Sequence, residues 1–462
     1  MKKSSRVFCY AFLGLPEEAE GQHMKQKITL ENSALFSIEN NYEQPTLCRA
    51  TITVCKSLVN SFFEETAIAL KGVVHAQGFQ HGTVPVEYIV KHYKINITEH
   101  LKEFFFKFGI VNFLFQEIRA QKLLVAGDPR LVEIFLEHGH NARFVFDLSV
   151  FPAIALNEWK YFPFKAPNRK NYKDLDRQVE LFIQDEQKNL DLYRADDGIA
   201  VGDWVNFNVS VVNASQSLLD ERFVQNFWLK LGNEEVENHL RSLFLGNKKG
   251  DEFVVTNKGL QDYFSDQLRA CYNFKVSIVD VVPHVYFCFD QFKDHFRVKT
   301  NKDMHKKLIE VFSYRNDVSQ RLAMVEEAFK LLLSRHRFFA PNHLVLRQQK
   351  IILSAIQRNP DYNVYRKQKD FNFWIQQLAE KQVKETLLID QLIYRENIVV
   401  NNEDMINYLN LDKRPRMREF IYFNLPDSKH YGQEMPLATH EISRVCAREK
   451  AINYVIHYLT KK

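Results

Sequence analysis

The feature that most constrains this sequence is its shortage of turn-forming residues. The 462 residues include only 15 Gly and 13 Pro, fewer together than the 38 Phe. In an average chain Gly and Pro make up about 12% of residues, roughly twice this share. Sandwiches and propellers need frequent turns, so the shortage argues against them and favours long helices. The many Phe side chains supply apolar surface, either for a core or for gripping an apolar partner.

Charge and cysteine content place the chain in a broad class. The formal net charge is +5, which is only mildly basic and does not identify a nucleic-acid-binding protein. The six Cys are scattered without a CxxC pair, as is typical of reduced thiols in a cytoplasmic protein. No apolar run reaches 18 residues, so no membrane-spanning helix is expected.

The first 23 residues are also compatible with a secreted or periplasmic protein. Basic residues precede the apolar run Val7–Leu15, which resembles a short signal sequence, but the acidic stretch that follows is a poor cleavage site. Met24 is an alternative start. A processed N-terminus near residue 23 would indicate a secreted or periplasmic protein.

Hydrophobic periodicity divides the chain into parts. Over 25–152 it predicts a compact α+β domain, with strands at 46–55 and 144–150 and helices at 57–75, 86–93 and 97–121. Three consecutive Phe, 104–106, cannot share one helix face, so the last of these helices must be buried on more than one side or expose an aromatic edge.

The rest of the chain is expected to form a β-rich part inside a helical one. Residues 153–195 read as a linker and a helix that joins the helical part. Residues 196–285 predict a small β-rich domain with strands at 204–212, 227–231, 252–255 and 274–281 and a short helix at 233–245. Residues 286–462 predict an all-α domain, helical from Thr300 to the end, with capping signals at Thr300 and Asn401.

Motifs for common enzyme chemistry are missing from the sequence. It contains no Walker loop, no GxGxxG after a strand, no HExxH and no GxSxG. His138 and His140 come closest to a metal pair, but their spacing is wrong for one helix face, and a solvated turn is the better interpretation. These features favour a binding protein that uses no cofactor and no metal.

One loop is built to display a side chain. Gly78 and Gly82 flank Phe79, Gln80 and His81, and Pro85 closes the segment between two predicted helices. Two Gly and a Pro shape a tight tip. Taken alone, the segment is also compatible with an ordinary helix–helix turn.

This loop resembles the ribosome-docking motif of the bacterial trigger factor family, Gly-Phe-Arg-x-Gly-x-x-Pro. Ala126-Gly127-x-Pro129, the opening strand Gly202–Phe207 and Ala340-Pro341 follow in the family's order, so the resemblance covers roughly residues 30–460. It implies an elongated α+β multidomain chain with an α+β ribosome-binding domain, an FKBP-like β-rich domain and an all-α C-terminal chaperone domain. It also implies that the helical body lies between the first two.

The docking loop departs from the family at one position. Gln80 stands where the family has Arg, with His81 beside it. A charge-assisted hydrogen bond contributes roughly 1.5–3 kcal/mol, so its loss could weaken docking about ten- to a hundredfold. The resemblance implies that Gly78, Phe79, Gln80, His81, Gly82 and Pro85 contact ribosomal protein and RNA at the exit tunnel.

The resemblance also implies a prolyl isomerase pocket in the β-rich domain. Such a pocket can lower the barrier of about 20 kcal/mol to amide rotation by desolvating the amide. Glu237 falls where the family has Ile, and Leu240 where it has Trp or Phe; a carboxylate in the wall would oppose desolvation. Whether the domain catalyses the reaction therefore stays open. The wall by resemblance would be Phe207, Phe227, Val236, Tyr263 and Phe274.

The expected function is that of an ATP-independent, ribosome-associated chaperone in the cytoplasm. Its partners would be ribosomes and nascent or unfolded polypeptides, with no membrane, and a homodimer is left open. Three alternatives remain: an enzyme that is mainly a prolyl isomerase, a secreted or periplasmic chaperone without ribosome binding, and a structural scaffold.

Overall fold

The computed structural model describes most of the chain from residue 35 onward. Val236 and Glu237 lie outside the described residues, as do the predicted leader and about half of residues 153–195, which were predicted to be a linker and a helix. The described residues are 35–461 apart from 45–46, 152–153, 157, 168–175, 178, 182, 185–197, 214–217, 219–222, 233–237, 265–267, 269, 285–292, 294–296, 307, 309–317, 413–417, 419, 427 and 431.

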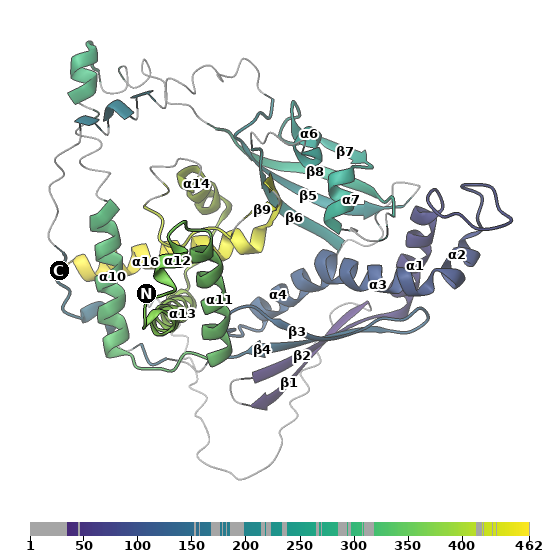
Figure 1. Ribbon diagram of the computed structural model, residues 1–462, viewed down its shortest axis with the longest axis horizontal. Helices are drawn as coiled ribbons and strands as arrows, with labels where there is room; N and C mark the ends of the chain where they lie inside the picture. Colours follow the sequence, from purple (N-terminus) through teal and green to yellow (C-terminus); the bar gives the residue numbers. More distant parts are fainter. Residues whose placement is uncertain are drawn as a thin grey trace, which may run out of the picture.

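The first part of the chain pairs an antiparallel sheet with a layer of helices (Figure 1). The predicted strands at 46–55 and 144–150 are confirmed as β2 and β4. The outer strands β1 and β3 were not predicted, because their mixed polar sequences become strands only by pairing with β2 and β4. The sheet order is β1-β2-β4-β3, from β1 (Phe36–Gln44), β2 (Leu47–Val54), β3 (Arg130–Phe135) and β4 (Ala142–Ser149).

The helices predicted in this part are also confirmed. The helix predicted at 97–121 is one long rod interrupted by a π-helical turn in the Phe-rich stretch. The elements are α1 (Lys56–Leu70), α2 (Val86–His92), α3 (Lys94–Phe105), the π turn η1 (Phe106–Ile110) and α4 (Val111–Ala120).

The β-rich part forms a second antiparallel sheet, of order β11-β6-β5-β8-β7. The four strands predicted there are confirmed, and the predicted helix appears as α6, which Asn238 caps by accepting from two backbone N–H groups. The elements are β5 (Trp204–Val212), β6 (Val224–Lys230), α6 (His239–Phe244), β7 (Glu252–Val255), α7 (Lys258–Phe264) and β8 (Asn273–Val282).

The last part is mainly helical, as predicted, and both capping signals form in the structure. The prediction that everything after Thr300 is helical is wrong at 429–438, where short strands form and β11 adds an edge to the second sheet. The elements are α10 (Val318–Arg335), α11 (Asn342–Gln357), α12 (Tyr362–Tyr365), α13 (Phe371–Arg395), α14 (Asn402–Asp412), β9 (Lys429–His430), β10 (Gln433–Glu434), β11 (Leu437–Ala438) and α16 (Thr439–Thr460).

The rod formed by α3, η1 and α4 lies between the two sheets (Figure 1). On one side Phe106 stacks on Phe146 of β4, with ring centroids 6.2 Å apart. On the other side Phe104 contacts Tyr272, which precedes β8, at 5.3 Å. The rod is thus buried on two sides, the first of the outcomes expected from its consecutive Phe residues.

Both sheets and the rod share one hydrophobic core. The expectation that the helical body separates the β-rich part from the first domain is therefore wrong. The fold class inferred from the sequence, an α+β chain of several parts, is confirmed. Spacing and composition cannot show which apolar faces pack together, because the packing partners come from segments far apart in the chain.

Phe223 holds the β-rich part against the rod. Its side chain is only 1% exposed, and its ring lies 4.7 Å from that of Phe62 and 5.3 Å from that of Phe105. Gly109 gives it room, because a Cβ at that position would come within 2.7 Å of the Phe223 ring. Beside it, Gln225 donates a 2.5 Å hydrogen bond to the Lys107 carbonyl in the π turn.

A buried polar cluster strengthens the same contact. The Tyr272 hydroxyl lies 2.7 Å from His100 Nε2 and 2.8 Å from the Thr66 hydroxyl. Burial lowers the pKa of His100 to about 4, so its ring is neutral at pH 7. A neutral ring costs less to bury than a charged one, so the cluster is compatible with an apolar interface.

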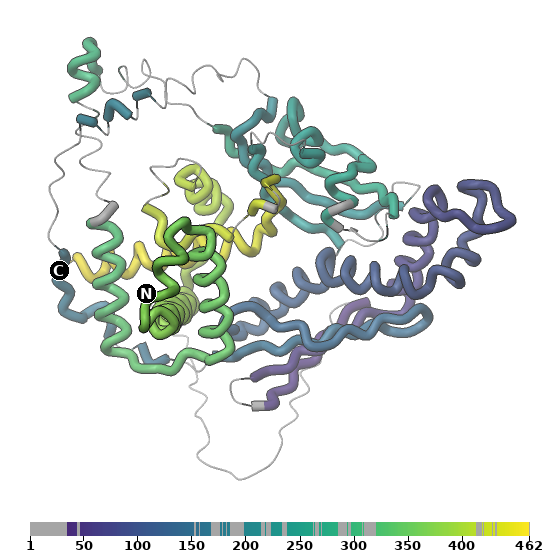
Figure 2. Tube along the Cα trace, viewed as in Figure 1, coloured from purple at the N-terminus to yellow at the C-terminus, as the bar shows by residue number. Residues whose placement is uncertain are grey.

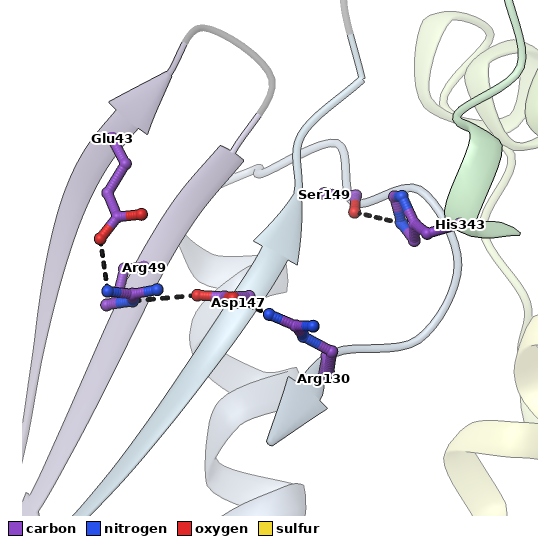
Figure 3. A network of polar contacts seen from close by, with 6 residues as sticks. All are labelled: Glu43, Arg49, Arg130, Asp147, Ser149 and His343. Carbon is purple, nitrogen blue, oxygen red and sulfur yellow. Dashed lines mark hydrogen bonds and ion pairs between the residues drawn. The ribbon is translucent and has the colours of Figure 1, made fainter. Parts of the chain in front are cut away.

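The first sheet carries an ion network on β2 and β4 (Figure 3). The Asp147 carboxylate accepts from Arg49 at 3.0 Å and from Arg130 at 2.6 Å, and Arg49 also pairs with Glu43. Burial alone would raise the pKa of Asp147, but the two arginine hydrogen bonds lower it below its usual value. The carboxylate therefore stays charged and joins three strands of the sheet.

The loop before β3 connects the first part to the helical body. Asp128 pairs with Arg347 of α11 and with Arg444 of α16, each at 2.8 Å. Gly127 has φ +76°, and a Cβ there would come within 2.5 Å of Leu344 on α11. Nearby, Ser149 and His343 share a 2.7 Å hydrogen bond (Figure 3).

Replacing Phe223 by Ala should destabilise both sheet-bearing parts together. Deleting a buried Phe ring costs about 3–5 kcal/mol, whereas Phe373→Ala, at a site 55% exposed, should cost under about 0.5 kcal/mol. Chemical unfolding followed by hydrogen exchange in β4 and β8 measures both effects. Equal stability of the two variants would show that the sheets do not share one core.

Candidate functional site

The loop between α1 and α2 lies at one end of the molecule, far from the α11–α13 helices (Figure 2). Gly78 has φ +89° and Gly82 has φ +79°, a region that L side chains rarely adopt. The backbone turns through hydrogen bonds from Phe79 N to Ala76 O and from Thr83 N to Gln80 O. Both glycines identified in the sequence are therefore required by the turn.

Phe79 is displayed by this loop. Its side chain is 40% exposed, and its ring lies 5.2 Å from Tyr88 of α2, which itself stacks on His92 at 4.0 Å. Gln80, His81 and Pro85 are exposed, and Gly82 is half-buried. The six predicted docking residues thus lie together in one loop, and the Phe79 ring packs against Tyr88.

The described residues of the predicted isomerase pocket come together in the second sheet. Phe207 lies 5.9 Å from Phe227, and Phe227 lies 5.6 Å from Tyr263. Phe274 is on the neighbouring strand β8, which pairs with β5. Of these four residues, Phe207, Phe227 and Phe274 are at most 2% exposed, and only Tyr263 is half-buried.

A side chain of α6 covers part of that aromatic wall. Phe244 of α6 packs 4.5 Å from the Phe207 ring, and both are fully buried. Leu240, one of the two departures from the family, is 3% exposed beside Gly259. Burial raises the pKa of Tyr263 to about 12, so its hydroxyl stays protonated at neutral pH.

The helical body exposes apolar side chains in one region. Eight of the 23 large apolar residues exposed in the described part of the chain fall between 339 and 378. They lie on or beside α11, α12 and the start of α13. Patches of this kind mark interaction surfaces. They are Phe339, Leu346, Ile351, Val364, Tyr365, Phe373, Trp374 and Leu378.

The described residues contain no cluster of three or more side chains suited to hold a metal ion. His138 and His140 flank Gly139 in a turn, as interpreted from the sequence. Within the same residues, no helix combines the length and the apolar character that crossing a bilayer needs.

Comparison with known proteins points to one family. Residues 36–182 match the family described as bacterial trigger factor protein. The trigger factor of Geotalea daltonii is 23% identical over 397 residues, which is 83% of this chain and 88% of that protein. The trigger factor of Desulfatibacillum aliphaticivorans is 21% identical, over 73% and 78% of the two chains.

The chain is thus similar to trigger factors over most of its length, and its first part matches the family model. A solved structure titled "Promiscuous Substrate Recognition in Folding and Assembly Activities of the Trigger Factor Chaperone" is 15% identical, with a TM-score of 0.36, over 91% of this chain and 99% of that one. The family match over residues 36–182 includes the Gly78–Pro85 loop.

Two features, the buried contact of Phe223 and the exposure of Trp374, were not found from the sequence. Phe223 carried no signal, because one Phe among 38 does not reveal its partners. Trp374 sits in an amphipathic helix whose apolar residues would usually be assigned to a core. A helical projection that places Trp374 beside exposed polar positions, away from Ile375, could have identified it.

Gly78 and Gly82 should resist substitution for a purely conformational reason. A Cβ at Gly78 or Gly82 would meet no atom within 4 Å, so Ala there costs only the left-handed backbone, about 1–2 kcal/mol. Gly72 is the matched control, with equal space and no positive φ. Thermal unfolding of Gly78→Ala, Gly82→Ala and Gly72→Ala tests this. Equal melting temperatures for the three would argue against the loop geometry.

Proposed function

We propose that this protein is a divergent trigger factor, an ATP-independent chaperone that docks on ribosomes near the exit tunnel and holds nascent or unfolded chains. The observation that carries the proposal is the display of Phe79, 40% exposed between two glycines with positive φ. An exposed ring held in a fixed turn loses little entropy on binding, so it suits a docking contact. The proposed place of action is the cytoplasm. The proposed function is compatible with both a monomer and a homodimer.

Each part of the chain has its own proposed role. Residues 25–152 dock, 153–195 join the helical body, 196–285 form the FKBP-like part and 286–462 hold clients. The distance between the docking loop and the exposed apolar helices supports this division (Figure 1). One end can stay on the ribosome while the other meets the emerging chain.

Co-sedimentation with ribosomes of the source organism tests the docking. Phe79→Ala with Gln80→Ala should reduce binding at least about tenfold, since an interface anchor contributes roughly 1.4 kcal/mol or more. Gln80→Arg should tighten binding, because it introduces a charge-assisted contact to RNA or acidic protein. Ile68→Ala on α1, 43% exposed, is the control. Unchanged binding by the double variant would exclude the loop as the dock.

Prolyl isomerisation is the second candidate function, and the burial of the pocket wall argues against a strong activity. A proline peptide needs access to the aromatic wall, yet Phe207, Phe227 and Phe274 are covered. We expect the β-rich part to act mainly as a support for the rod.

Two further alternatives make their own predictions. A structural scaffold would not suppress the aggregation of an unfolded client. A secreted chaperone would have a processed N-terminus near residue 23.

A proline-peptide assay separates chaperone from isomerase. The expected rate for the full chain lies within about twofold of the uncatalysed rate, which is set by a barrier near 20 kcal/mol. Leu240→Trp restores a residue that the family has at this position, and its rate is compared with that of the unmodified chain. A large acceleration by the unmodified chain, lost on Tyr263→Ala, would establish it as an isomerase.

A further inference from the structure

Two histidines meet at the Gly78–Pro85 loop. His75 lies between α1 and the loop, His81 lies within the loop, and their ring centroids are 4.9 Å apart. They are six positions apart in the sequence, a spacing that would not place them on one helix face. The turn made by Gly78 and Gly82 therefore brings them together. Both side chains are exposed.

The fold does not use the polar groups of these two rings. No hydrogen bond or ion pair joins the ring of His75 or His81 to a residue in the described part of the chain. By contrast, the rings of His100, His336 and His343 each share a hydrogen bond with a neighbouring group. The nitrogens of the His75–His81 pair are thus available to a ligand.

The separation of the two rings suits one shared cation. A bond of about 2.0–2.1 Å from an imidazole nitrogen to Zn²⁺ places the ion about 3.2 Å from the ring centroid. At that distance, centroids 4.9 Å apart correspond to a nitrogen–zinc–nitrogen angle of about 100°, near the tetrahedral value. Because both side chains are exposed, rotation about their own bonds can direct one nitrogen of each ring at the ion.

The surroundings of the pair limit which cation fits. Over the described residues, no third His, Cys, Asp or Glu completes a metal cluster. Water would fill the remaining coordination positions, so the site is open and exchanges its ion. Two imidazoles with water suit Zn²⁺ and similar transition cations, whereas Mg²⁺ and Ca²⁺ prefer oxygen ligands.

We propose that His75 and His81 form a two-histidine site for Zn²⁺ that clamps the loop to the segment following α1. The chelate closes a ring across the turn that presents Phe79, so bound zinc stabilises that turn. This inference goes beyond the proposed function. Its tests use no ribosome, so the metal site and ribosome docking can fail independently.

Zinc titration of the full chain, after removal of metal with EDTA, tests the site. Thiols such as that of the exposed Cys271 can also bind zinc, so the readout is the ring ¹³C–¹H signal of each histidine. The chain supplies two of the four ligands of a structural zinc site, so we expect both signals to shift with one Kd on the order of 10 µM. Mg²⁺ at about 1 mM should shift neither signal.

Single substitutions show whether the two rings act as a pair. His75→Gln should weaken zinc binding at His81 at least about tenfold, and His81→Gln should do the same at His75, because each change leaves one ligand. His92→Gln is the matched control and should leave the Kd unchanged. His92 is also exposed beside the loop, but its ring stacks on Tyr88.

Amide hydrogen exchange at Phe79 and Thr83 measures the clamp. Both amides donate to carbonyls within the turn. With free Zn²⁺ at ten times the Kd, their exchange should slow about tenfold, because opening the turn must first release the ion. The same zinc concentration should not slow exchange in His81→Gln.

Several results would overturn the inference. The first is that the His75 and His81 signals shift with different Kd values or not at all. The second is that one substitution leaves the affinity of the other ring intact, or that His92→Gln weakens binding as much. The third is that zinc binds without slowing exchange at Phe79 and Thr83.

Discussion

The burial of one Phe-rich rod between two sheets determines how the rest of this molecule is arranged. Phe106 faces the first sheet while Phe104 and Phe108 face the second, and Phe223 fills the space left by Gly109. Because the two sheets share a core, the β-rich part is held against the first part of the chain. The buried His100–Tyr272–Thr66 cluster adds directional hydrogen bonds to that contact.

This arrangement separates two exposed surfaces. The Phe79 loop extends beyond the rod at one end, and the helical body is attached at the other through Asp128 and its two arginines. The Gly78–Pro85 loop is stiffened by local backbone geometry, while the α11–α13 helix pair has its own small core. The proposed docking surface and the proposed client surface could therefore act at the same time.

Much of the candidate site was predictable from local sequence. The Gly78 and Gly82 turn follows from glycine's access to positive φ, and the helices around it follow from apolar spacing. The buried state of Phe207, Phe227 and Phe274 was not predictable in the same way. An aromatic residue on a strand looks alike whether it lines an open pocket or is covered by Phe244.

The sequence by itself determined many of the elements: the helices of the first part, the strands β5 to β8 of the second sheet, two strands of the first, and the glycine loop. These depend on periodicity and on backbone preferences within a few residues. Only the tertiary structure decided that the rod is covered on two sides, that β11 joins a distant sheet, and that Phe223 is buried while Trp374 is exposed. The physical reason is that burial depends on which apolar faces from remote segments meet, and an amphipathic segment leaves several such pairings open.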